Sequence, residues 1–388
     1  MTLGNTYNRL LYSAALRVAR NAKSRYHRKN MYAFNRSLAR RMADGWDEES
    51  RREAYRRDVL PYWKQFGRRP KRFWFELAGS RDYRMDPRYI PSDLYYYELL
   101  PYLNNLPFYF ALEDKNYLDL RFPDVKQAPT VCRRIAGEYY DETMALIGPD
   151  DAARLCMERE GALFIKPALY TSFGDGIRMF DPSACTVERI MELFLETGTN
   201  FIVQEKIRQH RALDALTAQS VSTIRVCSLF VKGSVFIPNV YLRVGTSGTD
   251  HVKVGKEYNA ELLPDGRLSP RVCLDENRWY DNRRDKIFPD GIVIPGIDRV
   301  LAEVKRLHPR MGHLKWIGWD FTLDEDGDPL LIEFNSAPGD SAQRVCGRPL
   351  FGEMTDWILE DYFRGRSMDD NQLQGCWSTN EDISRFLA

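Results

Sequence analysis

Apolar and polar residues recur with two different periods along this chain. Over roughly the first 65 residues, apolar positions return every three to four residues with arginines between them, which predicts amphipathic helices over 3–18 and 32–65. The same helical spacing returns in four later segments: 92–103, 152–159, 297–307 and 351–363.

Strand-like runs of β-branched and aromatic residues dominate after about residue 200. The predicted strands are 162–166, 177–180, 201–205, 222–231, 234–243, 318–323 and 330–335. Because the strands and helices are mixed without regular βαβ alternation, we predict an α+β fold class.

Composition narrows the class of protein. The 388 residues carry 56 Lys+Arg against 55 Asp+Glu, so the net charge of +1 argues against a polybasic nucleic-acid binder, and we expect no nucleic-acid partner. No run of 18 apolar residues occurs, so we expect no membrane-spanning helix. Seven scattered cysteines without a C-x-x-C pair predict free thiols in a reducing compartment, and hence a cytoplasmic location.

The charge is distributed unevenly along the chain. Residues 1–74 hold 19 Lys+Arg and 6 Asp+Glu, a local net charge of +13, which leaves −12 for residues 75–388. One interpretation is a helical layer whose arginines are solvated or paired with the acidic body of the chain, residues 75–388. The other is a basic surface that contacts anionic lipid at the inner face of a membrane, or an acidic glycan. Both interpretations stay open.

The most informative segment runs from Gly318 to Asn335, where two apolar-rich runs flank Asp326-Gly327. This dipeptide favours a two-residue type I′ hairpin turn. The resulting register pairs Asp320 with Glu333 across the two strands, and the amide of Asn335 shares their face. Two facing carboxylates need a cation between them, and oxygen ligands of this kind suit Mg²⁺. The alternative is a surface hairpin whose acids face solvent.

A second group of candidates lies upstream of the hairpin. Lys166 ends an apolar strand, and the loop 171–177 that follows contains Gly174 and Gly176. Glycines allow backbone N–H groups to approach an anion, and a nearby lysine supplies charge for a phosphate. No G-K-[ST] follows, which excludes a Walker A loop. Lys115 is a further candidate phosphate contact; the alternatives are an ordinary turn and a solvated lysine.

The order of these motifs resembles the ATP-grasp fold, and most closely the sugar-transfer associated ATP-grasp family. The resemblance covers roughly residues 110–345. It rests on Asp114-Lys115, Phe164–Pro167, the 171–177 loop, Gln204–His210, Ser222–Arg225, Leu242–Gly245, Asp250-His251, Asp320 and Ile332–Gly339. It implies two α+β subdomains that grip ATP, preceded here by a basic helical extension.

The resemblance also implies ATP and Mg²⁺ as cofactors and gives each candidate residue a role. Contacts to ATP are implied for Lys115, Lys166, Gly174, Gly176, Gln204, Glu205, Ile207 and His210. Metal ligation is implied for Asp320, Glu333 and Asn335, and stabilisation of the transferred phosphoryl group for Arg225 and Arg243. The expected domains are a helical region 1–90, a lid 91–200, a metal and nucleotide subdomain 201–345, and a helical tail 346–388.

Three features depart from the family pattern. Many ATP-grasp ligases carry an arginine two residues before the first metal aspartate, where this chain has Gly318. Relatives often show Asp-Asn where this chain has Asp250-His251. The usual amino-terminal α/β domain has no clear counterpart in the basic segment.

What the resemblance implies about function is a ligase that joins a carboxylate to an amine through an acyl phosphate. Its substrates would be small molecules, sugar-linked and destined for a surface polysaccharide if the family's association applies. Two alternatives remain: a kinase that uses the same ATP site with a hydroxyl acceptor, and a non-catalytic nucleotide-binding module.

Overall fold

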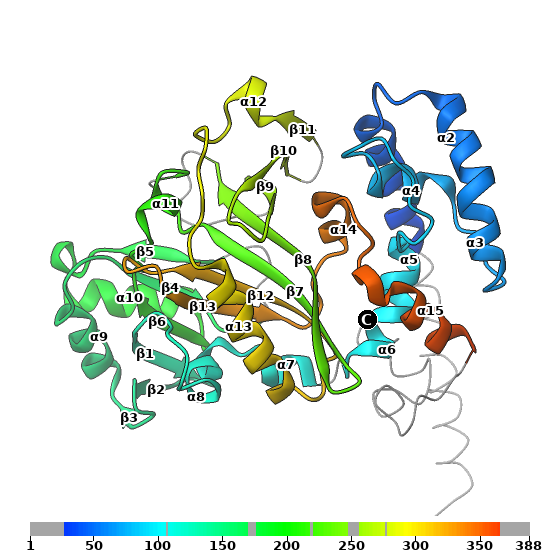
Figure 1. The fold of residues 1–388 in the computed structure, drawn as a ribbon. Helices are drawn as coiled ribbons and strands as arrows, with labels where there is room; N and C mark the ends of the chain where they lie inside the picture. The colour runs from blue at the N-terminus through cyan, green and yellow to red at the C-terminus, as the bar shows by residue number, and fades with distance from the viewer. Residues whose placement is uncertain are drawn as a thin grey trace, which may run out of the picture. The chain divides into compact units, whose positions relative to one another are not determined.

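The computed structural model describes residues 27–105, 108–169, 176–217, 220–246, 256–275 and 278–364. The helix predicted over 3–18 lies outside these residues. The chain forms two compact units (Figure 1). Unit 1 contains the residues up to Pro107, His313–Trp316 and the residues from Gly339 onward, and unit 2 contains Phe108–Gly312 and Ile317–Pro338. The division into 1–90, 91–200, 201–345 and 346–388 stays a prediction.

Most of the regular elements of unit 1 are helices. After a helix over 27–42, its elements are α2 (Glu48–Ala54), η1 (Tyr55–Val59), α3 (Leu60–Lys64), α4 (Arg72–Ala78), α5 (Ser92–Leu94), η2 (Tyr95–Leu99), α6 (Leu100–Leu103), α14 (Ser341–Cys346), η7 (Gly352–Met354) and α15 (Thr355–Arg364). The helix predicted over 32–65 is therefore two helices. They separate where Gly45 adopts a left-handed φ of 82° and the Asp47 side chain caps α2 by accepting from Ser50 N at 2.7 Å.

Two proline residues account for the wide helical turns of unit 1. Each π-type turn, η1 and η2, precedes a Leu-Pro pair whose proline is Pro61 or Pro101. Because proline has no N–H to donate, the helix loses one bond at this point and widens locally instead of ending. Around these helices lies an aromatic core, in which Trp316 Nε1 donates to the hydroxyl of the buried Tyr95 at 3.0 Å.

The first sheet of unit 2 has six strands in the order β3-β2-β1-β6-β4-β5, and all its neighbouring strands are antiparallel. The strands are β1 (Thr130–Ile135), β2 (Glu138–Asp141), β3 (Leu146–Ile147), β4 (Leu163–Pro167), β5 (Arg178–Phe180) and β6 (Phe201–Glu205). Helices α9 (Pro149–Met157) and α10 (Val187–Thr197) contribute Cys156 and Phe194 to the core that covers this sheet.

The second sheet of unit 2 has seven strands in the order β11-β10-β9-β8-β7-β12-β13. They are β7 (Thr223–Val231), β8 (Ser234–Gly245), β9 (Glu257–Leu262), β10 (Leu268–Leu274), β11 (Arg278–Asp281), β12 (Trp316–Leu323) and β13 (Pro329–Asn335). Helix α13 (Ile297–Leu307) packs on β7, β8 and β13. Short helices complete the unit: α7 (Tyr109–Leu112), η4 (Lys115–Tyr117), α8 (Leu118–Arg121), η5 (Pro182–Ala184), α11 (Arg211–Asp214), α12 (Asn282–Asp285) and η6 (His308–Arg310).

The α+β class is confirmed, with a helical amino-terminal region, and each of the seven predicted strands has a counterpart. Strands β1–β3 and β9–β11 and helix α10 were not predicted. Of the described cysteines, all six are free thiols, as expected. No helix in the described part of the chain is both long and apolar enough to cross a bilayer.

Candidate functional site

The β12–β13 hairpin brings the predicted metal residues together. Asp320 lies opposite Glu333, and Gly318 lies opposite Asn335, so the predicted pairing of the two carboxylates is confirmed. On the other face of the hairpin, Trp319 and Phe334 pack with ring centroids 5.7 Å apart. The polar face is therefore held by an apolar layer behind it.

The predicted turn, however, is wrong. Gly327 has a φ of 81° whereas Asp326 does not have a positive φ, so no type I′ turn forms. Instead, Gly327 N donates to Asp324 O at 2.9 Å, and Asp324 N donates to Asp328 O at 3.0 Å, which makes a three-residue loop with glycine in its left-handed position. The Asp324 carboxylate favours this loop because its Oδ1 accepts from Asp326 N and Asp328 N.

A bulge restores the register that the longer loop would otherwise shift. Near the turn, Phe321 pairs with Leu331, one position away from the predicted register. The pairing then shifts between Asp320 and Phe321, with Ile332 as the extra residue of β13. The two deviations cancel, and Asp320 still faces Glu333.

Asp320 is the centre of a buried charge network. The Arg225 guanidinium on β7 donates to both of its carboxylate oxygens, at 2.5 and 2.7 Å. Asn335 Nδ2 donates to Asp320 Oδ2 at 3.2 Å, and Arg243 Nη1 lies 3.8 Å from the same oxygen. Burial opposes the charge on Arg225, but Asp320 outweighs it and the pKa of the guanidinium lies well above its usual value.

Gly318 leaves room for this arrangement. A Cβ at position 318 would lie 2.8 Å from Pro338 Cβ and 3.3 Å from Arg225 Cδ. The space beside Asp320 that an arginine at this position would need is thus filled by Arg225 and Pro338. Arg225 on β7 pairs with Tyr241 on β8, and Arg243 follows Tyr241 by two residues. Because side chains alternate along a strand, Arg225 and Arg243 lie on the same face of the sheet.

Arg243 has a buried partner of its own. Its Nη2 and Nε donate to Glu257 Oε2 on β9 at 2.8 and 3.1 Å. Glu257 also accepts from Asn259 Nδ2 at 3.3 Å. Arg243 therefore spans two buried carboxylates, those of Glu257 and Asp320.

The two predicted lysines lie in η4 and in strand β4 of the first sheet, and both interact with Glu333. Lys115 begins η4, and its Nζ lies 3.5 Å from Glu333 Oε2, while its backbone N donates to Ala168 O. Lys166 Nζ donates to Gln204 Oε1 at 3.1 Å. Burial lowers the pKa of Lys166 to about 8, with Glu333 raising it and Lys115 lowering it.

Sequence reasoning missed Glu113. Glu113 is half-buried, and its Oε1 accepts from the backbone N–H of Ser336, the residue after Asn335. Burial raises its pKa to about 7, the Ser336 hydrogen bonds lower it, and Glu333 raises it further. The acidic pair Glu113-Asp114 before Lys115 was visible in the sequence, but nothing in its spacing indicated that the first of the two carboxylates contacts the backbone after Asn335.

The remaining predicted residues are less close to the carboxylates. Gln204 Nε2 donates to Ala128 O at 3.3 Å, Glu205 lies 3.7 Å from an Arg159 nitrogen, and Ile207 is half-buried. His210 lies at the turn end of the hairpin, where its backbone N donates to Leu323 O and its Nδ1 accepts from Ala212 N as the cap of α11.

The glycine loop falls largely outside the described residues. Gly174 is among those not described. Gly176 has a φ of 79°, and a Cβ there would lie 2.8 Å from Pro167 Cγ, so both its backbone conformation and its surroundings require glycine.

Chemically, the donor set on the hairpin fits a magnesium ion. Two carboxylates and an amide oxygen are hard ligands, and Mg²⁺ usually takes few protein oxygens beside phosphates and water. Among the described residues, no cluster of three or more His, Cys, Asp or Glu side chains could form an all-protein metal site. Any metal here would therefore share its coordination with a bound substrate.

The sequence matches the sugar-transfer associated ATP-grasp family over residues 149–356, more than half of the chain. The chain belongs to this family. Its α+β fold is accordingly the ATP-grasp fold, which is ligase-like in architecture, and both sheets of that fold lie in unit 2.

Comparison with individual ATP-grasp proteins gives weaker similarities. A D-alanine–D-alanine ligase of Parabacteroides distasonis is 29% identical over 100 residues, which are 24% of this chain and 30% of that protein. D-alanyl-alanine synthetase A of Vibrio cholerae is 14% identical with a TM-score of 0.39 over 65% of each chain. An L-amino acid ligase of Bacillus licheniformis is 12% identical with a TM-score of 0.38 over 67% of this chain and 49% of its own. These alignments span less than two thirds of each of the three relatives.

Proposed function

We propose that this protein is a Mg²⁺- and ATP-dependent ligase that joins a carboxylate to an amine through an acyl phosphate. The observation that carries the proposal is the polar face of the β12–β13 hairpin. There, Asp320 faces Glu333 with the Arg225 guanidinium beside them. Lys115 adds a second positive group to the same cluster.

In this proposal Asp320, Glu333 and the amide oxygen of Asn335 hold Mg²⁺. The ion would neutralise charge on the phosphates of ATP and keep them in place. For Asp320 to serve as a ligand, one of the bonds from Arg225 must be released. A guanidinium freed in this way is available for a phosphate oxygen, because its planar fork suits phosphate as well as carboxylate.

The nucleotide contacts come from the other sheet and from the segment before it. Lys115 and Lys166 hold phosphate oxygens, and the 171–177 loop, with Gly174 and Gly176, covers them through backbone N–H groups. The adenine ring lies against the hinge formed by Gln204, Glu205 and Ile207. His210 orders the end of that hinge by capping α11.

The chemistry needs positioning and charge stabilisation but no protein nucleophile. A carboxylate oxygen of the substrate attacks the γ-phosphorus of ATP, and ADP leaves with the electrons of the broken P–O bond. Arg225 and Arg243 stabilise the negative charge on the transferring group. A neutral amine then attacks the acyl carbon, loses a proton and displaces phosphate, which leaves an amide.

The family association suggests the substrate class. We propose that the carboxylate or the amine is sugar-linked, and that the product is a building block of a surface polysaccharide. The buried pairs on strands β8 and β9, centred on Arg243 and Glu257, would line the substrate side of the site.

ADP release in the presence of a panel of amino acids and uronic acids tests this proposal, with added hydroxylamine as a trap. An acyl phosphate reacts with hydroxylamine to give a hydroxamate, so we expect a hydroxamate in the reaction with the true carboxylate substrate. A stable phosphate ester without hydroxamate would identify a kinase instead. Nucleotide binding without ADP release for every candidate would identify a non-catalytic module.

A further inference from the structure

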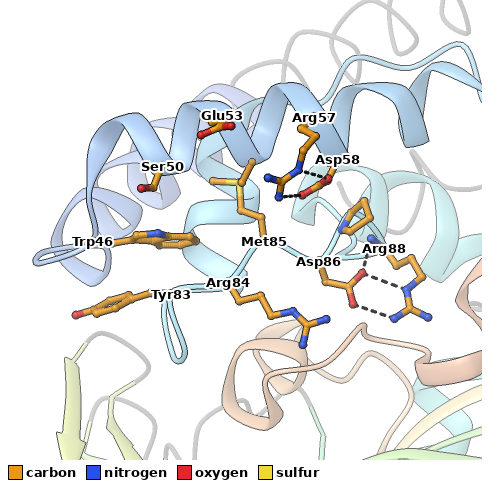
Figure 2. A pocket seen from close by; sticks show the side chains of 12 residues that line it. Trp46, Ser50, Glu53, Arg57, Asp58, Tyr83, Arg84, Met85, Asp86 and Arg88 are labelled. Atoms are coloured by element: carbon orange, nitrogen blue, oxygen red, sulfur yellow. Dashed lines mark hydrogen bonds and ion pairs between the residues drawn. The ribbon is translucent and has the colours of Figure 1, made fainter.

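A cavity of about 640 Å³ lies within unit 1, away from every residue proposed to bind ATP. Helix α2 and turn η1 form one wall, the segment 83–88 forms the opposite wall, and Trp46 and Tyr83 lie at one end (Figure 2). Its volume is in the range of sites that take a small molecule, about 300–1,000 Å³.

One end of the cavity is aromatic. Trp46 and Tyr83 lie with ring centroids 5.8 Å apart and ring planes inclined by 31°. Tyr83 is 44% exposed. Its backbone has a left-handed φ of 53°, which is unfavourable for a bulky residue. Its hydroxyl donates to Asp44 O at 2.9 Å, which fixes the ring. An unfavourable backbone that holds an exposed ring beside a cavity is typical of a binding site.

The opposite end carries two forked ion pairs (Figure 2). Arg57 donates to both carboxylate oxygens of Asp58 at 2.9 and 2.8 Å, and Arg88 donates to both oxygens of Asp86 at 3.1 and 2.9 Å. Each pair leaves further N–H donors and carboxylate lone pairs in close proximity.

The charges that line the cavity balance. Arg84 and Glu53 add one positive and one negative group to the two ion pairs, so three arginines face three carboxylates. Such a lining does not select for a simple anion or cation. It offers donors and acceptors together, next to an apolar aromatic surface.

We propose that this cavity binds a saccharide. A pyranose ring has an apolar C–H face that packs on the exposed ring of Tyr83, which Trp46 backs. The hydroxyls of the sugar both donate and accept, as the Arg57–Asp58 and Arg88–Asp86 pairs do. The inference does not depend on the proposed ligase chemistry.

The test is calorimetry and saturation-transfer NMR on the full-length chain with lactose, cellobiose, maltose, N,N′-diacetylchitobiose and a digalacturonate as probes. We expect at least one probe to bind, with saturation transferred most strongly to its C–H face. Inorganic phosphate at the same concentrations serves as the anion probe. If none of the five saccharides binds, or if phosphate alone binds, the proposal is overturned.

Two variants locate the binding. Tyr83→Asn removes the ring, and asparagine tolerates the left-handed backbone, so the helical unit should still fold. We expect the Kd to rise about tenfold. The Arg57 side chain, at the other end of the cavity, is 66% exposed. Arg57→Gln should therefore also raise the Kd of the same probe. The matched control is Phe34→Asn, an aromatic that is 64% exposed in the same unit but does not line the cavity. Equal affinity in Tyr83→Asn and the unmodified protein overturns the assignment.

A third variant separates this inference from the ligase proposal. Glu333→Gln removes a proposed metal ligand in unit 2 and should leave the saccharide Kd unchanged. If the protein releases no ADP with any substrate, saccharide binding that depends on Tyr83 still stands. If saccharide binding is lost in Glu333→Gln but kept in Tyr83→Asn, the sugar binds at the ATP-grasp site and the cavity proposal is wrong.

Discussion

At the scale of single residues, Asp320 and Glu333 differ sharply although they face each other. Asp320 is buried with Arg225, whereas the side chain of Glu333 is 34% exposed. Removing the charge of Asp320 leaves Arg225 buried without its partner, which costs about 3–5 kcal/mol. Glu333 is therefore the better position for testing metal binding without loss of the fold.

Glu333→Gln should lower kcat/KM for ATP about 100-fold, because the proposed metal loses a charged ligand. The folded state should be nearly unaffected, since glutamine has the same shape and the site is partly solvated. Steady-state ADP release, with thermal unfolding on the same samples, measures both effects. The matched control is Glu325→Gln, an exposed acid in the loop of the same hairpin. Unchanged turnover in Glu333→Gln would contradict the metal assignment.

Glu113 gives a prediction about pH. Its pKa is raised by burial from 4.5 to about 7, so the folded chain binds more protons than the unfolded chain between these values. Stability from this group is therefore fully present below about pH 4.5 and is lost as the pH rises toward 7, by about 3 kcal/mol.

Glu113→Gln should remove this dependence, because glutamine cannot ionise and its oxygen can still accept from Ser336 N. Urea unfolding of both proteins between pH 5 and 8 measures the difference. We expect the variant to be the more stable protein at pH 8, with the two values converging at pH 5. A parallel pH dependence in both proteins would show that Glu113 is not the responsible group.

At the scale of elements, the β12–β13 hairpin determines the site through two deviations from ideal pairing. The Asp324–Asp328 loop is one residue longer than the predicted turn, and the bulge at Ile332 compensates for it. A bulge bends its strand and redirects the side chains around it, and this bulge lies directly beside Glu333.

Two glycines of this hairpin provide a matched pair of substitutions. At Gly327 an added Cβ would meet nothing closer than 3.6 Å, so Gly327→Ala should cost only the left-handed backbone, about 1 kcal/mol. At Gly318 it would lie 2.8 Å from Pro338, so Gly318→Ala should cost about 1–3 kcal/mol through overpacking and also displace the Arg225 fork.

Urea unfolding and ADP release together distinguish the two variants. Gly327→Ala should lose stability but keep its kcat, whereas Gly318→Ala should lose both stability and kcat. Equal kcat in the two variants would contradict the role given to the space beside Asp320.

Two of the strands that sequence patterns missed, β1 and β9, bury charged residues. Strand β1 contains Arg133, which is fully buried with two donors to the Asp119 carboxylate at 2.7 and 3.0 Å. Strand β9 buries Glu257 and Glu261. Because hydropathy patterns treat such residues as exposed, they read these strands as loops.

At the scale of the whole molecule, the chain divides its tasks between two units. All the described residues proposed to bind ATP or metal lie in unit 2, and the whole cavity lies in unit 1. Many arginines of the basic amino-terminal segment have acidic partners within unit 1: Arg51 with Glu48 and Glu76, and Arg68 with Glu98. Arg51–Glu76 and Arg68–Glu98 are pairs with residues 75–388 of the kind that the first interpretation predicts, and contact of the segment with anionic lipid or glycan stays a prediction.

Hydrogen exchange should reveal this division directly. Saturating Mg·ATP should protect amides in β4, β6 and β13, because the ligand stabilises the unit that binds it. Peptides covering 46–58 and 83–88 should be unaffected by nucleotide and become protected by the saccharide. Protection of the 83–88 peptide by Mg·ATP alone would contradict the assignment of separate sites.

The sequence by itself determined the fold class and the strands with apolar runs, and it predicted that Asp320 faces Glu333 without foreseeing the longer loop and the bulge that together keep this pairing. Each depends on local periodicity or on spacing within one hairpin, where backbone geometry fixes which side chains share a face. Only the tertiary structure decided that Arg225 occupies the space beside Gly318 and that the Glu113 carboxylate accepts from Ser336 N. It also brought Trp46 and Tyr83 together around a cavity. These contacts join residues far apart in the chain, and their pairing depends on packing that no local pattern records.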